Sequence, residues 1–279
     1  MGGRFSRSWR MIKHSAAILQ QDRELMVFPL LSSIAALLVF ISFVPLIIPA
    51  PAMQQGEAGS FNALALGLLY LSEYFVMFFF NTALVGAAMI RMDGGDPTIS
   101  DGLRIAWSKA GRILGYAMIA ATVGILLRAV GERFGLLGRM IVGLFGIAWT
   151  AASFLAVPIL ASRDVGPLDA LKESATLLKQ TWGENVISNS GIGLIFILIY
   201  VLAFVIAGFM LSTASTTGNM SLIIGIIAVS IIGLIVIGLL QTALQGIFSA
   251  VLYRFATNGQ NTGGFSADTL SQAFTAKLS

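Results

Sequence analysis

The sequence contains no cysteine, and His14 is the only histidine among its 279 residues. The absence of cysteine excludes a disulfide framework and thiolate chemistry. It also nearly excludes a metal site built from histidine and cysteine. Neither an H-E-x-x-H motif nor a G-x-x-x-x-G-K-S/T phosphate loop occurs. We therefore expect a protein that is not an enzyme, with no catalytic residue, no cofactor and no metal.

Charge is also scarce. Charged residues make up 11% of the chain and hydrophobic residues 57%, whereas a soluble domain has about 25% charged residues. A single soluble core would not hide so much apolar surface, and a lipid bilayer is the solvent that accommodates it. The net charge is +4 and the basic residues lie beside apolar segments, so we expect anionic membrane lipids as partners. Nucleic acid is not expected, because no recognition motif accompanies the charge.

The chain contains long apolar runs. A helix needs about 20 apolar residues to cross ~30 Å of hydrocarbon. The segments that meet this requirement are Val27–Ala50, Phe61–Ile90, Ile113–Val130, Gly135–Ala161, Val186–Leu211 and Met220–Leu252. The sequence therefore predicts an all-α, polytopic membrane protein with six transmembrane helices. We expect the first span to be retained, since the 26-residue leader before it is longer than the charged start of a signal peptide.

Lysine and arginine are distributed unequally between the two sides of these spans. One side carries 14 of them, in residues 1–26, 91–112, 162–185 and 253–279, and the other side carries 3. Because cytoplasmic loops are enriched in these residues, we expect both termini in the cytoplasm. The loop around Arg133 is the exception to this rule.

A repeat relates the beginning of the chain to its end. Residues 12–21 and 171–180 share lysine, serine, alanine, leucine and glutamine at a constant offset of 159, which also relates Val27 to Val186 and Phe61 to Met220. We therefore expect a single membrane domain, 1–279, made of three parallel repeat units, 1–90, 91–161 and 162–252. Each unit is an amphipathic helix followed by a transmembrane hairpin. The cytoplasmic tail, 253–279, is expected to add a short C-terminal helix.

The amphipathic segments precede the first, third and fifth spans, with apolar side chains at helical spacing and basic side chains opposite. Such helices can lie in the membrane interface, with tryptophan at headgroup level and cations toward lipid phosphate. The alternative is packing against the ends of the spans, and the pattern does not separate the two. Ser100 is expected to cap the second of these helices. The candidate headgroup contacts are Arg7, Trp9, Arg10, Lys13, Trp107 and Trp182.

Three stretches together carry a family resemblance: SRSWRMIKHSAAILQQDRELMVFPLLS, GPLDALKESATLLKQTWGEN and LYRFATNG followed by GF. With them the chain resembles a family of uncharacterised bacterial integral membrane proteins over essentially its whole length. More distantly, it is similar to the membrane domain attached to some glycerophosphodiester phosphodiesterases. The resemblance implies a six-helix protein of the bacterial inner (cytoplasmic) membrane. It supplies no catalytic residue.

Glu73 interrupts the apolar run LYLSEYFVMFFF at residues 69–80. It lies 12 residues after Phe61, or ~18 Å at 1.5 Å per residue, near the middle of the expected span. An ionised carboxylate there is unfavourable by a few kcal/mol, so Glu73 either remains protonated or pairs with Arg128. Glu132, one turn beyond Arg128, is an equally good partner for the arginine. In either case we expect Glu73 to face protein or water rather than lipid.

Three amides complete the candidate intramembrane polar site. Gln241 and Gln245 share one helix face, and Asn81 lies at a similar depth and could join them through hydrogen bonds. One interpretation is structural, a polar clamp between helices worth ~1 kcal/mol for each hydrogen bond. The other is functional, an ion or proton path or a polar cavity.

These features favour a non-enzymatic scaffold, accessory subunit or membrane organiser. Interfacial helices occupy much of the sequence, and polar groups within the spans are few. This hypothesis implies a protein partner or a homo-oligomer in addition to lipid. The alternative is a channel or transporter for a small ion or solute that uses Glu73.

Overall fold

The computed structural model describes residue 13 and residues 15–47, 58–182 and 191–258, and every regular element in these ranges is a helix. Helical residues 15–21 precede a short 3-10 helix, η1 (Arg23–Met26). The first half of the chain continues with α2 (Val27–Ile47), α3 (Ala58–Met92), α4 (Ile99–Ser108) and α5 (Ala110–Arg133). The second half contains α6 (Gly135–Ser153), α7 (Ala156–Ser162), α8 (Pro167–Trp182), α9 (Gly191–Thr216) and α10 (Met220–Asn258).

Within the described ranges, six helical segments are long and apolar enough to cross a membrane, which agrees with the predicted multi-pass protein. The predicted start of the fifth span, Val186, lies outside the described residues. So do the C-terminal helix expected in the tail and the leader residues Arg7, Trp9 and Arg10.

The fourth span was predicted as one helix, but it is broken between α6 and α7. Pro158 explains the break, because proline has no N–H and its ring clashes with the carbonyl four residues earlier, here that of Phe154. The N–H of Leu155 donates a hydrogen bond to Ser174 Oγ of α8 at 3.0 Å. The amide at the break is therefore satisfied within the fold, and α8 is held against it.

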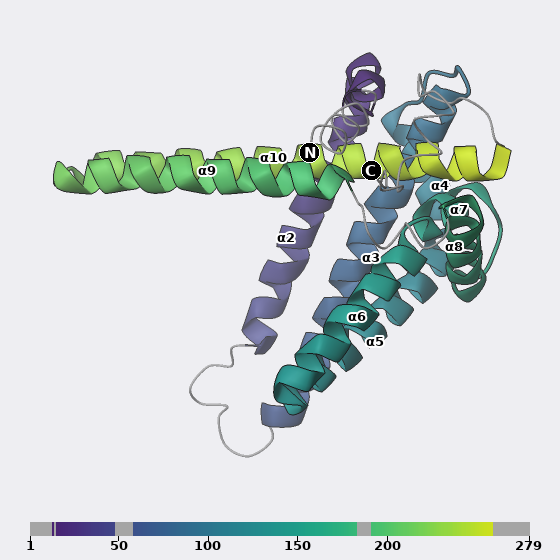
Figure 1. Cartoon of the computed structure of the whole chain (residues 1–279), viewed down its shortest axis with the longest axis horizontal. Helices are drawn as coiled ribbons and strands as arrows, with labels where there is room; N and C mark the ends of the chain where they lie inside the picture. Colours follow the sequence, from purple (N-terminus) through teal and green to yellow (C-terminus); the bar gives the residue numbers. More distant parts are fainter. Residues whose placement is uncertain (1–12, 14, 48–57, 183–190, 259–279) are drawn as a thin grey trace, which may run out of the picture.

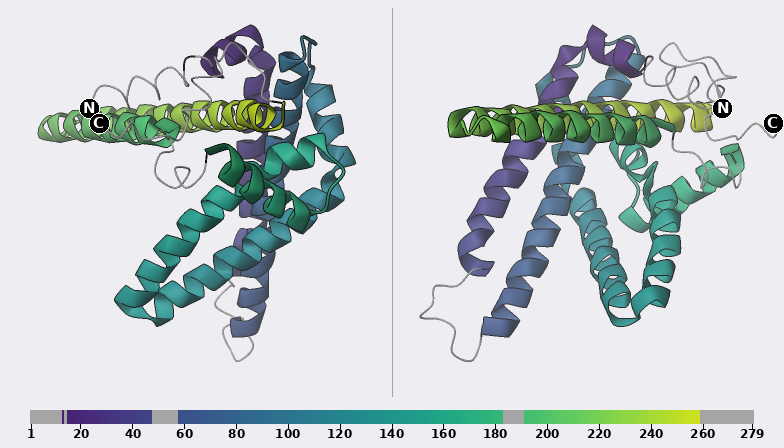
Figure 2. Two further views of the ribbon diagram at one scale, coloured as in Figure 1. Left: turned by 45° about the vertical axis from the view of Figure 1, so that its right-hand side comes forward. Right: turned by 60° about the vertical axis from the view of Figure 1, so that its left-hand side comes forward.

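The spans form three helical hairpins, α2–α3, α5–α6 and α9–α10 (Figure 1). Helix α3 is central, since it contacts α2, α4, α5, α7 and α10. The α9–α10 hairpin runs across α2 and α3 rather than alongside them, as all views agree (Figures 1 and 2). The three hairpins therefore do not share one axis, and the arrangement as three parallel repeats stays a prediction.

The core surrounds the crossing of α10 over α3. The first part of α10 is exposed, whereas its last part is buried against the rest of the fold, from Ala243 to Tyr253. Residues 197–211 and 220–240 form a projecting pair of helices, here named the arm, most of whose side chains are exposed and apolar. The largest fully buried side chains include Tyr116, Phe28, Leu25, Leu84, Ile113, Leu155 and Ile247.

Ion pairs gather where the short helices lie, and we name this the charged end. Buried Asp22, the N-cap of η1, pairs with Arg91 at 3.2 Å, which joins the start of η1 to the end of α3. Arg254 pairs with Asp93 and so joins the end of α10 to the same place. The other pairs of this end are Arg91–Asp96, Arg104–Asp101, Lys109–Asp164, Arg112–Asp164 and Arg163–Glu173. The pairs of Asp22, Asp93 and Asp164 hold together segments that are far apart in the sequence.

We expect acid to weaken the contact of Asp164 with α5. The hydrogen bond from Lys109 and the charge of Arg112 hold the pKa of Asp164 below its ordinary value of 3.8. A carboxylate with a lowered folded-state pKa stabilises the fold above pH 3.8, and this contribution is lost as the pH falls through the folded-state pKa. Thermal unfolding should therefore show Asp164→Asn less stable than the parent at neutral pH, with a difference that disappears in acid. A difference in thermal stability between Asp164→Asn and the parent that does not change with pH would contradict this role of the Asp164 carboxylate.

The short helices α4 and α8 bury one face each against the spans. Gly102 and Ala106 of α4 and Ala170 and Ser174 of α8 are buried, so packing against the spans accounts for one face of each helix. The prediction that Ser100 caps α4 is wrong: the N-cap is Thr98. Thr98 and Asp101 form a capping box in which each side chain accepts a hydrogen bond from the other's backbone N–H, and this satisfies two free amides at once.

Candidate functional site

A groove between α2 and α3 is lined by several polar side chains of the spans. Residues Tyr70, Glu73, Tyr74, Met77 and Asn81 recur at steps of three and four along α3, so they form one stripe. The stripe lines two adjoining cavities that share Ser32, Ser33 and Met77. We name them by their deepest polar group, the Glu73 cavity and the Asn81 cavity.

The Glu73 cavity has a volume of about 580 Å³. Glu73 Oε1 is buried and accepts no hydrogen bond from any described residue. The cavity lies between the middle parts of α2 and α3, and it is lined by Ser32, Ser33, Ala36, Phe40, Leu69, Tyr70, Glu73, Tyr74 and Met77. Glu73 therefore lines the cavity, while its Oε1 is covered by the surrounding atoms without a hydrogen-bond donor among the described residues.

Of the two partners considered for Arg128, the structure selects Glu132. Arg128 Nε donates to Glu132 Oε1 at 2.8 Å and Nη1 donates to Tyr70 Oη at 3.3 Å. Pairing of Glu73 with Arg128, one of the two alternatives left open for Glu73, is not the arrangement found. Glu132 lies one turn away on the same helix, so that pair forms without bringing two helices into register, whereas reaching Glu73 would draw Arg128 inward.

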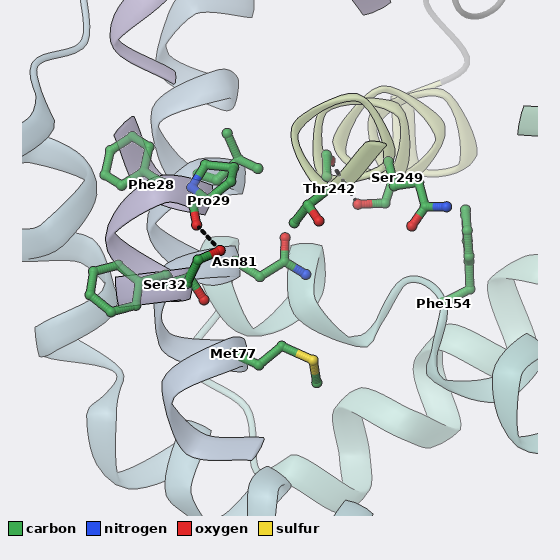
Figure 3. A pocket seen from close by; sticks show the side chains of 13 residues that line it. Phe28, Pro29, Ser32, Met77, Asn81, Phe154, Thr242 and Ser249 are labelled. Carbon is green, nitrogen blue, oxygen red and sulfur yellow. Dashed lines mark hydrogen bonds between the residues drawn. The ribbon is translucent and has the colours of Figure 1, made fainter. Parts of the chain in front are cut away.

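The Asn81 cavity lies beneath the crossing of α10 and has a volume of about 340 Å³. Its polar lining comes from three helices: Ser32 and Ser33 of α2, Asn81 of α3, and Thr242, Gln245 and Ser249 of α10. The side chains of Asn81 and Met77 project into the space between α2 and α10 (Figure 3). A Cβ on Gly246 would lie 3.1 Å from Asn81 Oδ1, so this glycine permits the close approach of α10 to α3.

The predicted cluster of amides forms only in part. Asn81 and Gln245 line the same cavity, but Gln241 does not line it. Asn81 Oδ1 is buried and accepts no hydrogen bond within the described part of the chain, so it does not accept the expected hydrogen bond from a glutamine. Helix α10 crosses α3 at a steep angle, and the turn that contains Gln245 lies against Asn81. Whether these residues act together in function stays a prediction.

The hydroxyl groups of the groove were not identified from the sequence. Ser32 and Ser33 are adjacent in an apolar run, and that pairing is the signal that could have identified them. Ser33 Oγ donates to Pro29 O of its own helix at 2.9 Å, and Ser249 Oγ donates to Gly246 O. Both oxygens retain lone pairs that can accept a further hydrogen bond.

The groove can offer oxygen acceptors but no positive charge. Its two cavities are lined by a carboxyl, two amides and several hydroxyls, and by no lysine, arginine or histidine. Among the described residues, no group of three or more histidine, aspartate and glutamate side chains could hold a metal ion. The arrangement suits a bound molecule that brings hydrogen-bond donors.

The structure describes three of the six candidate headgroup contacts, Lys13, Trp107 and Trp182. Lys13 is exposed, and Trp107 is 73% exposed while its ring meets Phe79 edge-on. Trp182 is the last residue of α8. No described contact tests a role of these residues toward lipid.

One family model matches the chain over residues 60–265, that of a family of unknown function, DUF6159. The match includes the α3 and α10 walls of the groove, whereas α2 precedes it. No curated protein and no solved structure matches the chain.

Proposed function

The chain belongs to this family, DUF6159, and we propose that it is a non-enzymatic scaffold, accessory subunit or organiser of other proteins in the bacterial inner membrane. The observation that carries the proposal is the arm. Its two helices extend beyond the core and expose apolar side chains on nearly all sides, such as Phe204, Phe209, Val229 and Ile232 at 61–71% exposed. An interfacial helix needs a polar face, so the arm suits lipid or another apolar helix.

A groove on the arm provides a surface for such a helix. It has a volume of about 550 Å³ and is apolar and lined in part by small residues, among them Ala203, Ala207, Gly208, Ser230 and Gly233. Small residues allow helices to approach closely, and in membranes this packing replaces the hydrophobic effect as the driving force. The charged end would meanwhile face the cytoplasm with both termini, as the distribution of lysine and arginine favours.

We further propose that the fold arose from the internal repeat. Ser15 and Ser174 are 159 residues apart, and both are fully buried. The shared burial at equivalent positions supports a relation between the first and third units, 1–90 and 162–252. The more distant similarity to the membrane domain of glycerophosphodiester phosphodiesterases remains a prediction on the same footing.

Association through the arm can be tested by extracting the protein in native lipid patches and weighing the particles. We expect a stoichiometric partner, either another protein or a second copy, that Gly233→Leu releases by filling the groove. Gly143→Leu on α6 is the matched control, because neither glycine has a neighbouring atom within 4 Å of an added Cβ. Particles that contain one copy and no partner in the parent protein would contradict the proposal.

A channel or transporter is the second candidate, and the unpartnered Glu73 in its cavity favours it. In this case proteoliposomes should show a flux of a small ion or solute that Glu73→Gln abolishes. A flux that survives this substitution would remove Glu73 from the path.

A further inference from the structure

Three arginines are gathered around the turn between α5 and α6, which we name the arginine tip. They are Arg128, Arg133 and Arg139. The turn lies at the end of these helices away from α4 and α8, and so away from the charged end (Figures 1 and 2). The connections 51–60 and 212–219 contain no lysine or arginine. Because loops opposite the cytoplasmic side are normally poor in basic residues, a cluster of three there calls for a negatively charged partner.

The fold neutralises only part of the charge of the arginine tip. Arg128 pairs with Glu132, the one acidic residue between positions 128 and 139. Arg133 and Arg139 are exposed and have no hydrogen-bond or ion-pair partner among the described residues. Glu57, the acidic residue of the α2–α3 connection, lies outside the described residues. Three arginines and one glutamate leave the tip with a net charge of +2.

The arginine tip reaches the level of the lipid headgroups. Arg112, near the start of α5, is 21 residues before Arg133, or ~32 Å along a straight helix, and the hydrocarbon layer is ~30 Å thick. Arg128 and Arg139 are six residues before and five residues after Phe134 in the turn, so they lie at a similar depth just below the headgroups. Long arginine side chains near helix ends extend from there to the interface. All three guanidinium groups can therefore meet one layer of phosphates.

Apolar side chains accompany the two arginines that have no partner. Phe134 and Met140 directly follow Arg133 and Arg139 in the sequence, and both are 62% exposed. A guanidinium group binds a phosphate through two parallel N–H donors, whereas an exposed apolar side chain gains from contact with hydrocarbon. A partner that uses both kinds of side chain carries a phosphate and an acyl chain in one molecule. A phospholipid has this combination.

We propose that the arginine tip is a binding site for an anionic phospholipid in the leaflet opposite the charged end. Arg133 and Arg139 donate to oxygens of its phosphate diester, and Phe134 and Met140 lie against its acyl chains. Phosphatidylglycerol fits the net charge of the tip, whereas a choline headgroup would bring a further positive charge beside the arginines. This site is separate from the amphipathic helices of the charged end, and it does not depend on the association proposed for the arm.

The test measures which lipid lies next to the tip in vesicles that contain the full chain. Gly143→Cys can be labelled with bimane at a single position, because the chain has no other cysteine. Gly143 lies one turn after Arg139 on the same helix face, and an added Cβ would meet no atom within 4 Å. Brominated phosphatidylglycerol and brominated phosphatidylcholine with identical acyl chains are compared as quenchers. We expect a preference for phosphatidylglycerol of about fivefold or more, as two arginines near an anionic surface would produce.

The double variant Arg133→Gln with Arg139→Gln, made in the labelled protein, should abolish this preference. The matched control is Arg104→Gln with Arg163→Gln, which removes the same charge from exposed arginines of the charged end and should leave the preference at the tip unchanged. Each preference is a ratio of two lipids for one variant, so a smaller amount of folded protein does not imitate its loss.

Glu132→Gln removes the acidic residue of the tip and frees Arg128 from its ion pair, so it should increase the preference for phosphatidylglycerol. Equal quenching by the two lipids in the parent protein would overturn the proposal and leave the arginines to an acidic protein segment. A preference that survives the double variant at Arg133 and Arg139 would also overturn it. Loss of the preference when excess glycerophosphoglycerol is added to the buffer would assign the site to a soluble phosphate compound instead of a lipid.

Discussion

Phe28→Ala is expected to lower the free energy of unfolding by about 3–5 kcal/mol, the range for removing a buried aromatic ring. Phe28 is 0% exposed. Its ring lies against Gly102 of α4 and also lines the Asn81 cavity. The substitution would remove the side chain that fills the space between α2 and α4 and enlarge a cavity that already exists. The unfolding free energy is measured by denaturing detergent titration in mixed micelles.

Phe40→Ala is the matched control for this prediction. Phe40 lies on the same helix, α2, but is 52% exposed. Substitutions away from packed sites usually change stability by no more than about 0.5 kcal/mol, so the control should unfold close to the parent. Equal losses in the two variants would show that Phe28 contributes only its hydrophobicity and not its packing.

Gly102→Ala is expected to destabilise the protein by about 1–3 kcal/mol, as overpacking of a closely packed site does. A Cβ at this position would lie 2.8 Å from the carbonyl oxygen of Ala83 and 2.8 Å from Phe28 Cε1. The side chain of Phe28 could rotate, but the backbone of α3 cannot withdraw without moving the centre of the fold. Helix α4 would therefore separate from α3, and its N-terminal part should become more accessible to proteolysis.

Gly111→Ala is the same substitution as Gly102→Ala, but it is not expected to lower the stability of the protein. Gly111 lies in α5 and an added Cβ would meet no atom within 4 Å. Alanine is more favourable than glycine by roughly 0.5–1 kcal/mol in a helix interior, and Gly111 lies in the first turn of α5, so this variant should be as stable as the parent or slightly more stable. Destabilisation of both variants by the same amount would contradict a specific contact at Gly102.

The coupling of Phe28 and Gly102 can be measured by a double-mutant cycle. Phe28→Leu shortens the side chain that the new Cβ of Gly102→Ala would meet, so the double variant should lose less stability than the sum of the two single losses. Residues in contact typically show coupling of about 0.5–3 kcal/mol. Strict additivity would mean that the carbonyl of Ala83 alone opposes the alanine.

The candidate site was predicted in part, because a charged or amide group is rare within an apolar run. That rarity drew attention to Glu73, Asn81 and Gln245. It did not identify Ser32 or Thr242, since serine and threonine occur in membrane helices with their hydroxyls bonded to their own backbone. Thr242 Oγ1, for example, donates to Gly238 O at 2.9 Å.

Contacts between helices were harder to predict from the sequence than the helices themselves. Arg128 had two partners at plausible distance by residue counting, and only the three-dimensional structure distinguished Glu132 from Glu73. The break at Phe154 follows from Pro158 by a local rule, yet the hydrogen bond from Leu155 to Ser174 joins residues 19 positions apart. No periodicity in the sequence contains that information.

The sequence by itself determined that the chain is helical and has six membrane-length segments, because the length of an apolar run and the thickness of a bilayer are both local quantities. Only the tertiary structure decided that α9 and α10 cross α2 and α3, that an exposed arm results, and that Glu73 and Asn81 line adjoining cavities of one groove. These features depend on close packing between distant residues, such as Gly246 against Asn81 and Gly102 against Phe28. Such contacts form only when the whole chain has folded.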